Sequence, residues 1–187
     1  MFNKRDVLTF GLCAIVLTIG ILAFSVFYKK QNNILEIVAY PDPILRKVAY
    51  PVNHIDNNVI SLGNDIIATL RYQTLVDFFV KRSIPRGLAA PQVGISKRLI
   101  VCGLFGEIKV MVNPEILERG GAYNGHDDCM SVDEDDNMIV KRSAYVKLRY
   151  TGLDNQEKVI TVRNRDAAFL EHEIDHLNGV LNIDYQE

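Results

Sequence analysis

The sequence predicts an α+β fold in which antiparallel strands surround a central helix, with an N-terminal transmembrane helix before the folded domain. Three observations support this prediction. Residues 7–28 form one uninterrupted run without a charged side chain. Short segments with strand-like patterns, separated by turn residues, follow one another between residues 99 and 163. A helical segment near the C-terminus contains His172-Glu173-Ile174-Asp175-His176.

The N-terminal run, from Val7 to Tyr28, is long enough to cross a bilayer as a helix. Basic residues flank it at 4–5 and 29–30. A cleaved signal peptide, cut near Ala23-Phe24-Ser25, is the alternative, but its apolar region usually has only about 7–15 residues. We therefore expect an uncleaved anchor and four parts of the chain: a tail at 1–6, the anchor at 7–28, a linker at 29–34 and a folded domain at 35–187.

The folded domain is predicted to begin with a helix. Apolar residues recur at helical spacing in Asn58–Phe79. Two strands follow at Leu99–Gly103 and Glu107–Val112, with the turn between them at Leu104-Phe105-Gly106. Asn113-Pro114, a typical turn pair, is expected to end the second strand.

Two further strands and a second helix are predicted to complete the domain. Apolar and basic side chains alternate in Ala144–Tyr150, which is typical of a half-buried strand. Asp154-Asn155 makes a turn into another strand at Lys158–Arg163. Asn164 is expected to cap the helix that carries the two histidines, and Gly179 to end it.

The composition restricts the classes of function. The chain of 187 residues has 21 basic and 23 acidic side chains and no basic stripe, so we do not expect direct binding to nucleic acid. Its three cysteines provide no disulfide framework, which favours a reducing compartment. Together with Arg46 and Lys47 after the anchor, this predicts a single-pass membrane protein whose folded domain lies in the cytoplasm.

The two histidines have the spacing of metal ligands. Residues four apart lie on one face of a helix, so His172 and His176 can reach a single ion. Glu173 then lies beside that ion, where a carboxylate can take a proton from water whose pKa the metal has lowered. The pattern predicts a hydrolytic metal centre; the alternative is an ordinary surface helix.

Such a centre needs a third protein ligand and one open position. Cys129 is the best candidate, because thiolate binds Fe(II) and Zn(II) strongly and its neighbours here are polar and acidic. The alternative for a single cysteine is a small buried apolar residue. That alternative fits Cys102, which lies in an apolar run, and Cys13, which lies in the predicted anchor.

A third segment, Gly87-Leu88-Ala89-Ala90-Pro91-Gln92, combines small residues with one amide side chain. Small residues let the backbone approach a ligand closely. The amide of Gln92 can donate a hydrogen bond to an oxygen that gains negative charge during a reaction. The alternative is a plain loop before a strand.

Together the segments resemble the peptide deformylases. The first family motif, which ends in Ala-Ala-x-Gln, matches Ala89-Ala90-Pro91-Gln92, and the second, Glu-Gly-Cys-Leu-Ser, matches Asp127-Asp128-Cys129-Met130-Ser131 in part. The third, Gln-His-Glu-x-Asp-His, matches Glu171–His176. The resemblance extends from about Leu35 to about Tyr185 and also covers Tyr40-Pro41-Asp42-Pro43-Ile44-Leu45-Arg46.

The resemblance implies an activity and a set of roles. The family removes the formyl group from the N-terminal formylmethionine of newly made proteins. By this resemblance Cys129, His172 and His176 would bind one metal ion, typically Fe(II), with Zn(II), Ni(II) or Co(II) also accepted. Glu173 would be the general base and then the general acid. Gln92 and the backbone N–H of Met130 would stabilise the oxyanion.

The resemblance also implies where the substrate binds. Arg86 and Gly87 begin the loop that pairs with the substrate backbone as a strand does. Ala168 and Phe169 lie about one helical turn before His172, where they would border the pocket for the methionine side chain or pack in the core. The expected partners are N-formylmethionyl nascent peptides, met near the ribosome or at the site of membrane insertion.

Several positions depart from the family pattern. Pro85 stands where the first motif usually has glycine, and Asp128 replaces the glycine of the second motif. These departures leave open a non-catalytic protein, tethered to the membrane, that binds metal or formyl peptides. A second rival is a zinc peptidase, which would need a downstream third ligand such as Asp184 or Glu187.

Overall fold

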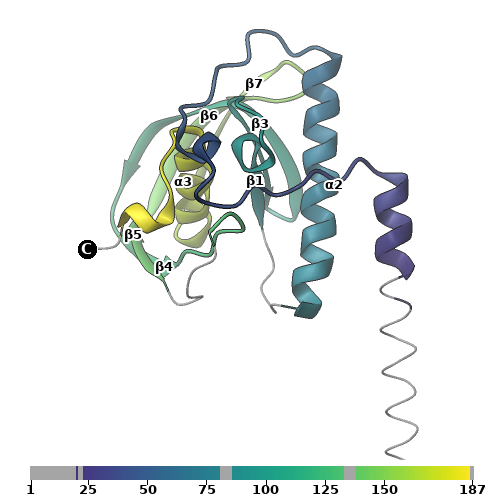
Figure 1. The fold of residues 1–187 in the computed structure, drawn as a ribbon. Helices are drawn as coiled ribbons and strands as arrows, with labels where there is room; N and C mark the ends of the chain where they lie inside the picture. Colours follow the sequence, from purple (N-terminus) through teal and green to yellow (C-terminus); the bar gives the residue numbers. More distant parts are fainter. Residues whose placement is uncertain (1–19, 21–22, 81–85, 133–137, 186–187) are drawn as a thin grey trace, which may run out of the picture.

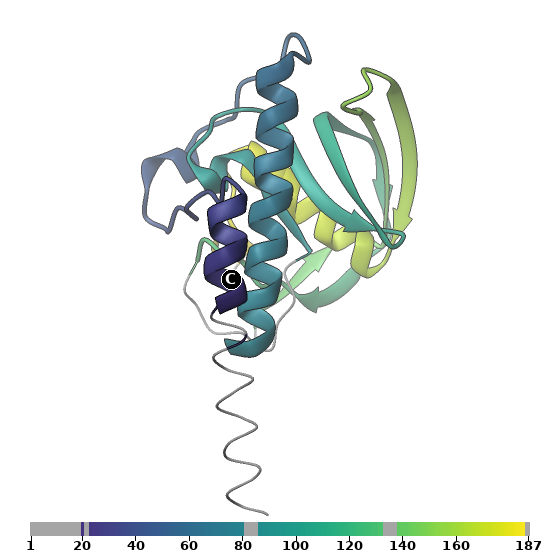
Figure 2. The same ribbon diagram turned by 90° about the vertical axis from the view of Figure 1, so that its right-hand side faces the viewer.

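The computed structural model describes residues 20, 23–80, 86–132 and 138–185. Most of the predicted anchor, namely residues 7–19, 21 and 22, lies outside these residues. Residues 23–31 are helical and run alongside the long helix α2 (Asn57–Val80), on which Tyr72 stacks against Tyr28 (Figures 1 and 2). Within the described ranges, no helix combines the length and the apolar character that a membrane span needs.

The folded domain is built on a five-stranded antiparallel sheet (Figure 1). Two further strands do not belong to this sheet and pair with each other. The helix that carries the two histidines is α3 (Arg165–Leu177). The order in the large sheet is β1 (Gly87–Ala89), β2 (Leu99–Leu104), β3 (Glu107–Gly120), β6 (Tyr145–Thr151) and β7 (Glu157–Arg163); the hairpin pairs β4 (Tyr123–His126) with β5 (Ile139–Arg142).

Strand β2 separates two apolar clusters because successive side chains of a strand point to opposite faces. Leu99 and Val101 pack in a cluster with residues of α2, whereas Ile100 and Cys102 pack in a cluster with residues of α3. The two helices therefore lie on opposite sides of this part of the sheet (Figure 2). Helix α3 also contacts β4 and β5, so strands of both sheets surround it, as the sequence predicts.

The predicted end of the second strand was wrong. Strand β3 continues through Asn113 and Pro114 to Gly120. Asn113 has a φ of 49°, and the pairing of β3 with β6 shifts register between Val112 and Glu115. Proline is tolerated at such a bulge because the ladder there does not require its missing N–H.

The start of α3 also differs from the prediction. Asn164 occupies the position before the helix, but its side chain makes no capping hydrogen bond and its φ and ψ are 52° and −123°. Its backbone N–H instead donates to the carbonyl of Ala144, 2.7 Å away. At the other end Gly179 follows the helix with a φ of 74°, so the predicted stop is confirmed.

The remaining predictions for the elements are confirmed within one or two residues, but three strands were missed. The tight turn between β2 and β3 has left-handed φ values at Phe105 and Gly106, 56° and 77°. Strands β1, β4 and β5 have three or four residues each, and none of them was predicted as a strand. Two of these missed strands flank the segment that contains Cys129.

Candidate metal centre

Helix α3 presents both histidines to the same point. Their Nε2 atoms lie 3.1 Å apart, and both side chains are buried. Cys129 lies in the loop between β4 and β5, and its Sγ is 3.4 Å from Nε2 of His176. The three donor atoms all lie within 4.8 Å of one another, so the structure brings together the three residues that the sequence singled out.

The donor atoms fit a small divalent cation. With metal–nitrogen bonds of about 2.1 Å and a metal–sulfur bond of about 2.3 Å, tetrahedral ligands are separated by roughly 3.4–3.6 Å. The observed separations of 3.1 and 3.4 Å are close to this range. One thiolate and two imidazoles are a donor set that suits Fe(II) and Zn(II), and three protein ligands leave a position for a reactant.

Asp127 fixes the orientation of the first histidine. Its carboxylate accepts a hydrogen bond from Nδ1 of His172, so Nε2 is the nitrogen that faces His176 and Cys129. Burial lowers the pKa of His172, but hydrogen bonds to Asp127 and Cys129 outweigh it and hold that pKa well above its usual value. In His176, burial and the nearby charge of His172 hold the pKa well below its usual value, which leaves a neutral imidazole.

Arg142 supports Asp127 from behind. Its guanidinium donates to Asp127 at 2.5 Å and to Asp175 at 2.8 Å, and only 3% of the arginine side chain is exposed. Burial by itself would raise the pKa of Asp127, but the hydrogen bond from His172 and the charge of Arg142 lower it to about 2. Tyr185 closes the chain of contacts, because its ring lies 4.8 Å under the guanidinium and its hydroxyl donates to Asp175 at 3.0 Å.

Glu173 lies on α3 beside the histidines and is 3% exposed. Burial raises the pKa of its carboxyl group to about 7, so the group can both hold and release a proton near neutral pH. Its Oε2 is buried and has no hydrogen-bond partner among the residues that the structure describes. An ideal Cβ built on Gly87 would lie 2.6 Å from Oε1 of Glu173, which shows that β1 passes directly in front of this carboxylate.

Gln92 lies in a short 3-10 helix, Ala90–Val93, directly after β1. Its Oε1 accepts a hydrogen bond from the Ala89 N–H at 2.8 Å, and this contact fixes the orientation of the amide. The Nε2 group therefore points toward Ser131 and Cys129, at 3.3 and 3.8 Å. The amide donors therefore lie beside the sulfur of Cys129, one of the three candidate metal ligands. Met130 directly follows Cys129 in a turn, so its backbone N–H belongs to the same loop as the cysteine.

The residues expected to bind substrate lie in two groups. Strand β1, which begins at Gly87, forms one edge of the large sheet. Phe169 is half-buried and packs on the core, and its Cζ would lie 2.3 Å from a Cβ at Gly87. Arg86 lies over the Phe169 ring at 5.2 Å. Ala168 is half-buried one turn before His172, and its place in a pocket remains a prediction.

The structure addresses several of the noted departures. Asp128 is exposed and is not among the described residues with positive φ, so aspartate causes no left-handed strain at this position. Asp184 pairs with Arg46 at 2.5 Å rather than with the histidines, which removes it as a third ligand for a zinc peptidase. Pro85 and Glu187 lie outside the described residues.

The residues that support the candidate metal ligands could not be predicted from the sequence. Arg142 and Tyr185 had no assigned role beyond packing, and Asp127 was read only as a substitute for glutamate. Glu171 was also missed: it anchors α3 by accepting hydrogen bonds from the N–H and hydroxyl of Ser143 at 2.7 and 2.8 Å. A buried arginine needs acidic partners, but no sequence spacing identifies which acids these are.

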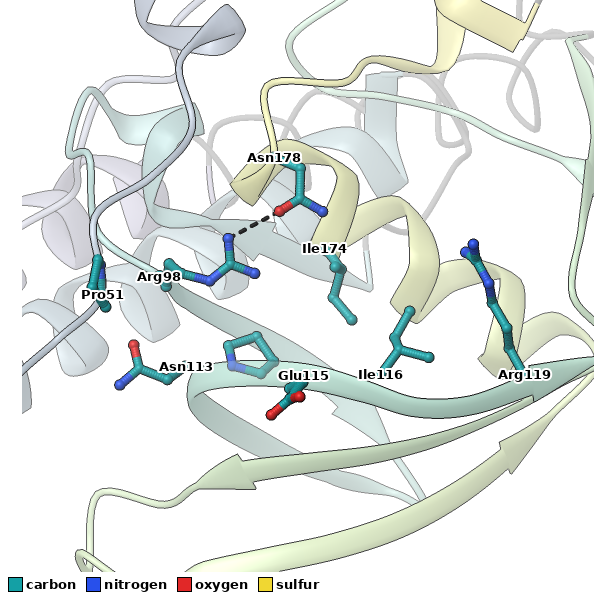
Figure 3. A pocket seen from close by; sticks show the side chains of 9 residues that line it. Pro51, Arg98, Asn113, Glu115, Ile116, Arg119, Ile174 and Asn178 are labelled. Atoms are coloured by element: carbon teal, nitrogen blue, oxygen red, sulfur yellow. Dashed lines mark hydrogen bonds between the residues drawn. The ribbon is translucent and has the colours of Figure 1, made fainter.

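A separate cavity of about 600 Å³ lies between α3 and β3 (Figure 3). Ile174 and Asn178 line it from α3 and the loop that follows, and Arg98 lines it from the segment before β2. Arg98 donates to Oδ1 of Asn178 at 2.9 Å (Figure 3). It also donates to the carbonyl of Leu177 at 3.3 Å, and both contacts stabilise the C-terminal end of the helix. None of the three candidate metal ligands lines this cavity.

Comparisons with known proteins identify relatives of the folded domain. A sequence model of the family described as polypeptide deformylase matches residues 34–187. A peptide deformylase from Desulfotalea psychrophila is 36% identical over 158 residues, which cover 81% of this chain and 87% of that protein. Peptide deformylase 1 from Clostridium acetobutylicum is 38% identical over 151 residues, which cover 81% and 93%.

Solved structures show the same fold. The crystal structure of peptide deformylase from Thermotoga maritima is 32% identical and superposes with a TM-score of 0.72, covering 82% of this chain and 98% of that one. An actinonin-bound class I type b peptide deformylase from Acinetobacter baumannii is also 32% identical, with a TM-score of 0.70 and coverages of 82% and 99%.

Proposed function

Because the chain belongs to the polypeptide deformylase family, we propose that the cluster of Cys129, His172 and His176, with Glu173 and Gln92 beside it, is a deformylase active site. The chain is a metal-dependent hydrolase that removes the formyl group from N-formylmethionyl peptides. The observation that carries the assignment of the site is the convergence of the three donor atoms within 4.8 Å, next to a buried carboxylate.

Each residue of the candidate site has its own role in the proposed reaction. Cys129, His172 and His176 would hold the ion, which supplies a Lewis acid that lowers the pKa of water and polarises the formyl carbonyl. Gln92 donates a hydrogen bond to the carbonyl oxygen as it gains negative charge, together with the N–H of Met130. One such donor contributes a factor of about 100–1,000 in rate.

Glu173 is the residue that accepts and then donates a proton in the proposed reaction. Its buried Oε2, which has no partner in the described part of the chain, faces the reactants as a base. Glu173 takes a proton from the attacking water. It gives this proton to the amine nitrogen when the bond between the formyl carbon and that nitrogen breaks. Strand β1, at the edge of the sheet, is the proposed place where the peptide pairs with Arg86 and Gly87.

We propose Fe(II) as the native ion, one per chain, because a mixed thiolate and imidazole set suits it and because the family resemblance implies it. The same donors accept Zn(II), Ni(II) and Co(II). Metal analysis of protein purified without oxygen tests this identity. An excess of another metal in protein from native cells would contradict it.

One assay tests the proposed function. The full chain is purified anaerobically with Fe(II), and formate release from a formyl-Met tripeptide is measured. We expect turnover by the wild type and at least a 100-fold loss in Glu173→Gln with the metal still bound. Glu157→Gln, an exposed change in β7, serves as the matched control.

The non-catalytic alternative makes the opposite prediction for this assay. A wild type that retains metal but releases formate no faster than Glu173→Gln would favour a protein that binds metal or formyl peptides without turnover. Asp128, one of the two features that favoured this alternative, is exposed and is not among the described residues with positive φ, which supports the catalytic proposal.

We further propose that residues 7–28 anchor the catalytic domain, residues 35–187, to the cytoplasmic face of a membrane, near chains emerging from the ribosome or entering the bilayer. The uncharged run and the cysteine-containing centre, which requires a reducing compartment, support this placement. Protease added to intact cells should leave the domain untouched. Its digestion from outside would contradict the proposed topology.

A further inference from the structure

Arg86, Asp166 and Phe169 form one contact unit at the start of α3. The guanidinium of Arg86 pairs with the carboxylate of Asp166 at 2.5 Å and lies over the ring of Phe169 at 5.2 Å. It also donates to the carbonyl of Gly103 at 3.3 Å. The side chains of this pair are only 27% and 32% exposed, so the arginine is held between the helix and the sheet.

The unit lies next to the catalytic carboxylate. Phe169 is four residues before Glu173 and therefore on the same face of α3, one turn away. A Cβ at Gly87 would meet Cζ of Phe169 at 2.3 Å and Oε1 of Glu173 at 2.6 Å, so the tip of the ring and the carboxylate reach the same point of β1. The arginine covers the face of the ring, and the ring edge remains toward that point.

We propose that Arg86 and Asp166 are positioning residues that hold the Phe169 ring beside Glu173, where its edge selects the long side chain of formylmethionine over shorter side chains. This inference rests on the proposed function and names a determinant of its substrate preference. Asp166 lies in the first turn of α3, where an acidic side chain is also stabilised by the helix dipole. The pair is thus tied to the helix that carries the ligands.

The chemistry of the first substrate residue fits this position. Its side chain begins only a few bonds from the formyl carbon, so it must lie close to Glu173. A thioether sulfur makes favourable contacts with the edge of an aromatic ring, whereas the methyl group of alanine is too short to reach it. A ring that is free to turn away would lose this contact without changing Glu173 or the metal ligands.

The test compares two substrates in the full-length enzyme. The ratio of kcat/KM for formyl-Met-Ala-Ala to that for formyl-Ala-Ala-Ala is measured in wild type and in Asp166→Asn. We expect the ratio to fall by about 3- to 10-fold, mainly through a higher KM for the methionine peptide. Phe169→Leu, which keeps apolar bulk, should lower the ratio equally. Arg86→Lys, which keeps the positive charge, should retain part of the wild-type preference for the methionine peptide.

A binding measurement and a matched pair provide the controls. Calorimetric titration with the products Met-Ala-Ala and Ala-Ala-Ala should show the same loss of preference without turnover. Arg46 and Asp184 also pair at 2.5 Å, and Arg46 also lies over an aromatic ring, Tyr40, at 5.4 Å. Asp184→Asn should therefore leave the substrate ratio unchanged.

The outcomes separate the two levels of the proposal. Formate release by the wild type, with the same ratio in Asp166→Asn, would overturn the selection by the ring and leave the proposed function intact. An equal fall of the ratio in Asp184→Asn would also overturn it, because an ion pair that does not contact Phe169 would then have the same effect on the ratio. No formate release by the wild type would overturn the proposed function and this inference with it.

Discussion

Asp127 has contacts in the structure that the sequence did not predict. It is buried, accepts the Nδ1 hydrogen bond of His172 and is paired with Arg142. Partners of this kind orient metal-binding histidines, and their removal typically lowers metal affinity by about 10- to 100-fold.

We therefore expect Asp127→Asn to weaken metal binding by about 10- to 100-fold, because His172 loses its charged partner. Competition with a chromophoric chelator measures the affinity. Asp154→Asn, which removes a surface partner of Lys158, should leave the affinity unchanged. Equal affinities in wild type and Asp127→Asn would show that His172 needs no anchor.

The two described cysteines should differ in reactivity. Cys102 is fully buried, and burial raises the pKa of its thiol far above the usual value, so it stays protonated and unreactive. Cys129 is half-buried, and its Sγ lies within 4.8 Å of a ring nitrogen of both His172 and His176.

A maleimide reagent applied to the folded, metal-free chain should modify Cys129 and leave Cys102 intact, and bound metal should protect Cys129. Peptide mass mapping reads out each site. Labelling of Cys129 that metal does not slow would argue against its role as a ligand.

Some functional residues could be predicted because their types and spacing are local. His172 and His176 are about one helical turn apart, Glu173 lies between them, and Cys129 is a cysteine among polar neighbours. Arg142 could not be predicted, because its partners Asp127 and Asp175 are 15 and 33 residues away. Only the fold brings these charges together.

At the scale of elements, the end of α3 is fixed by a close approach. Gly179 has a φ of 74°, and a Cβ there would lie 2.5 Å from the carbonyl oxygen of Arg46. The same loop is held by Ala49, whose N–H donates to the carbonyl of Leu177 at 2.9 Å. A side chain at 179 would push these segments apart.

Gly179→Ala should lower the free energy of unfolding by about 2–4 kcal/mol, through left-handed strain and overlap with the backbone of Arg46. Urea unfolding of the full chain measures the change. Gly106→Ala is the matched control, since Gly106 has a φ of 77° and an open surrounding, so it should lose only about 1 kcal/mol. Equal losses would show that the overlap relaxes without cost.

Long, patterned elements could be predicted and short ones could not. Helix α2 and strands β2, β6 and β7 have enough residues to show a period. Strands β1, β4 and β5 have three or four residues and depend on pairing with distant segments. The bulge at Asn113 was missed because Asn-Pro more often marks a turn.

At the scale of the whole molecule, the metal would join parts that are otherwise separate. Cys129 comes from the loop between β4 and β5, whereas the histidines come from α3, which packs on the large sheet. An ion that binds all three ligands favours the folded state over the unfolded chain.

Removal of the metal should therefore lower the melting temperature. At a free Ni(II) concentration about 1,000 times the dissociation constant, binding stabilises the fold by about 4 kcal/mol, or roughly 8–16 °C for a domain of this size. Scanning calorimetry with and without Ni(II) measures the shift. Mg(II), which prefers oxygen ligands, should cause none. A melting temperature that does not respond to Ni(II) would contradict the site.

The α+β class of the whole molecule could be predicted because the patterned strands follow one another in a run between two helices instead of alternating with helices. The positions of α2 and α3 on opposite faces of the sheet could not, since both helices have apolar residues that fit either face. The transmembrane anchor stays a prediction, because most of its residues lie outside those that the structure describes.

The contact of Tyr185 with Arg142 and Asp175 joins the segment after α3 to the charged residues behind the candidate metal ligands. Loss of this ring would uncover one face of the guanidinium while every ligand remained in place. Tyr185→Ala should then release its metal faster than the wild type during dialysis, although none of its ligands has changed.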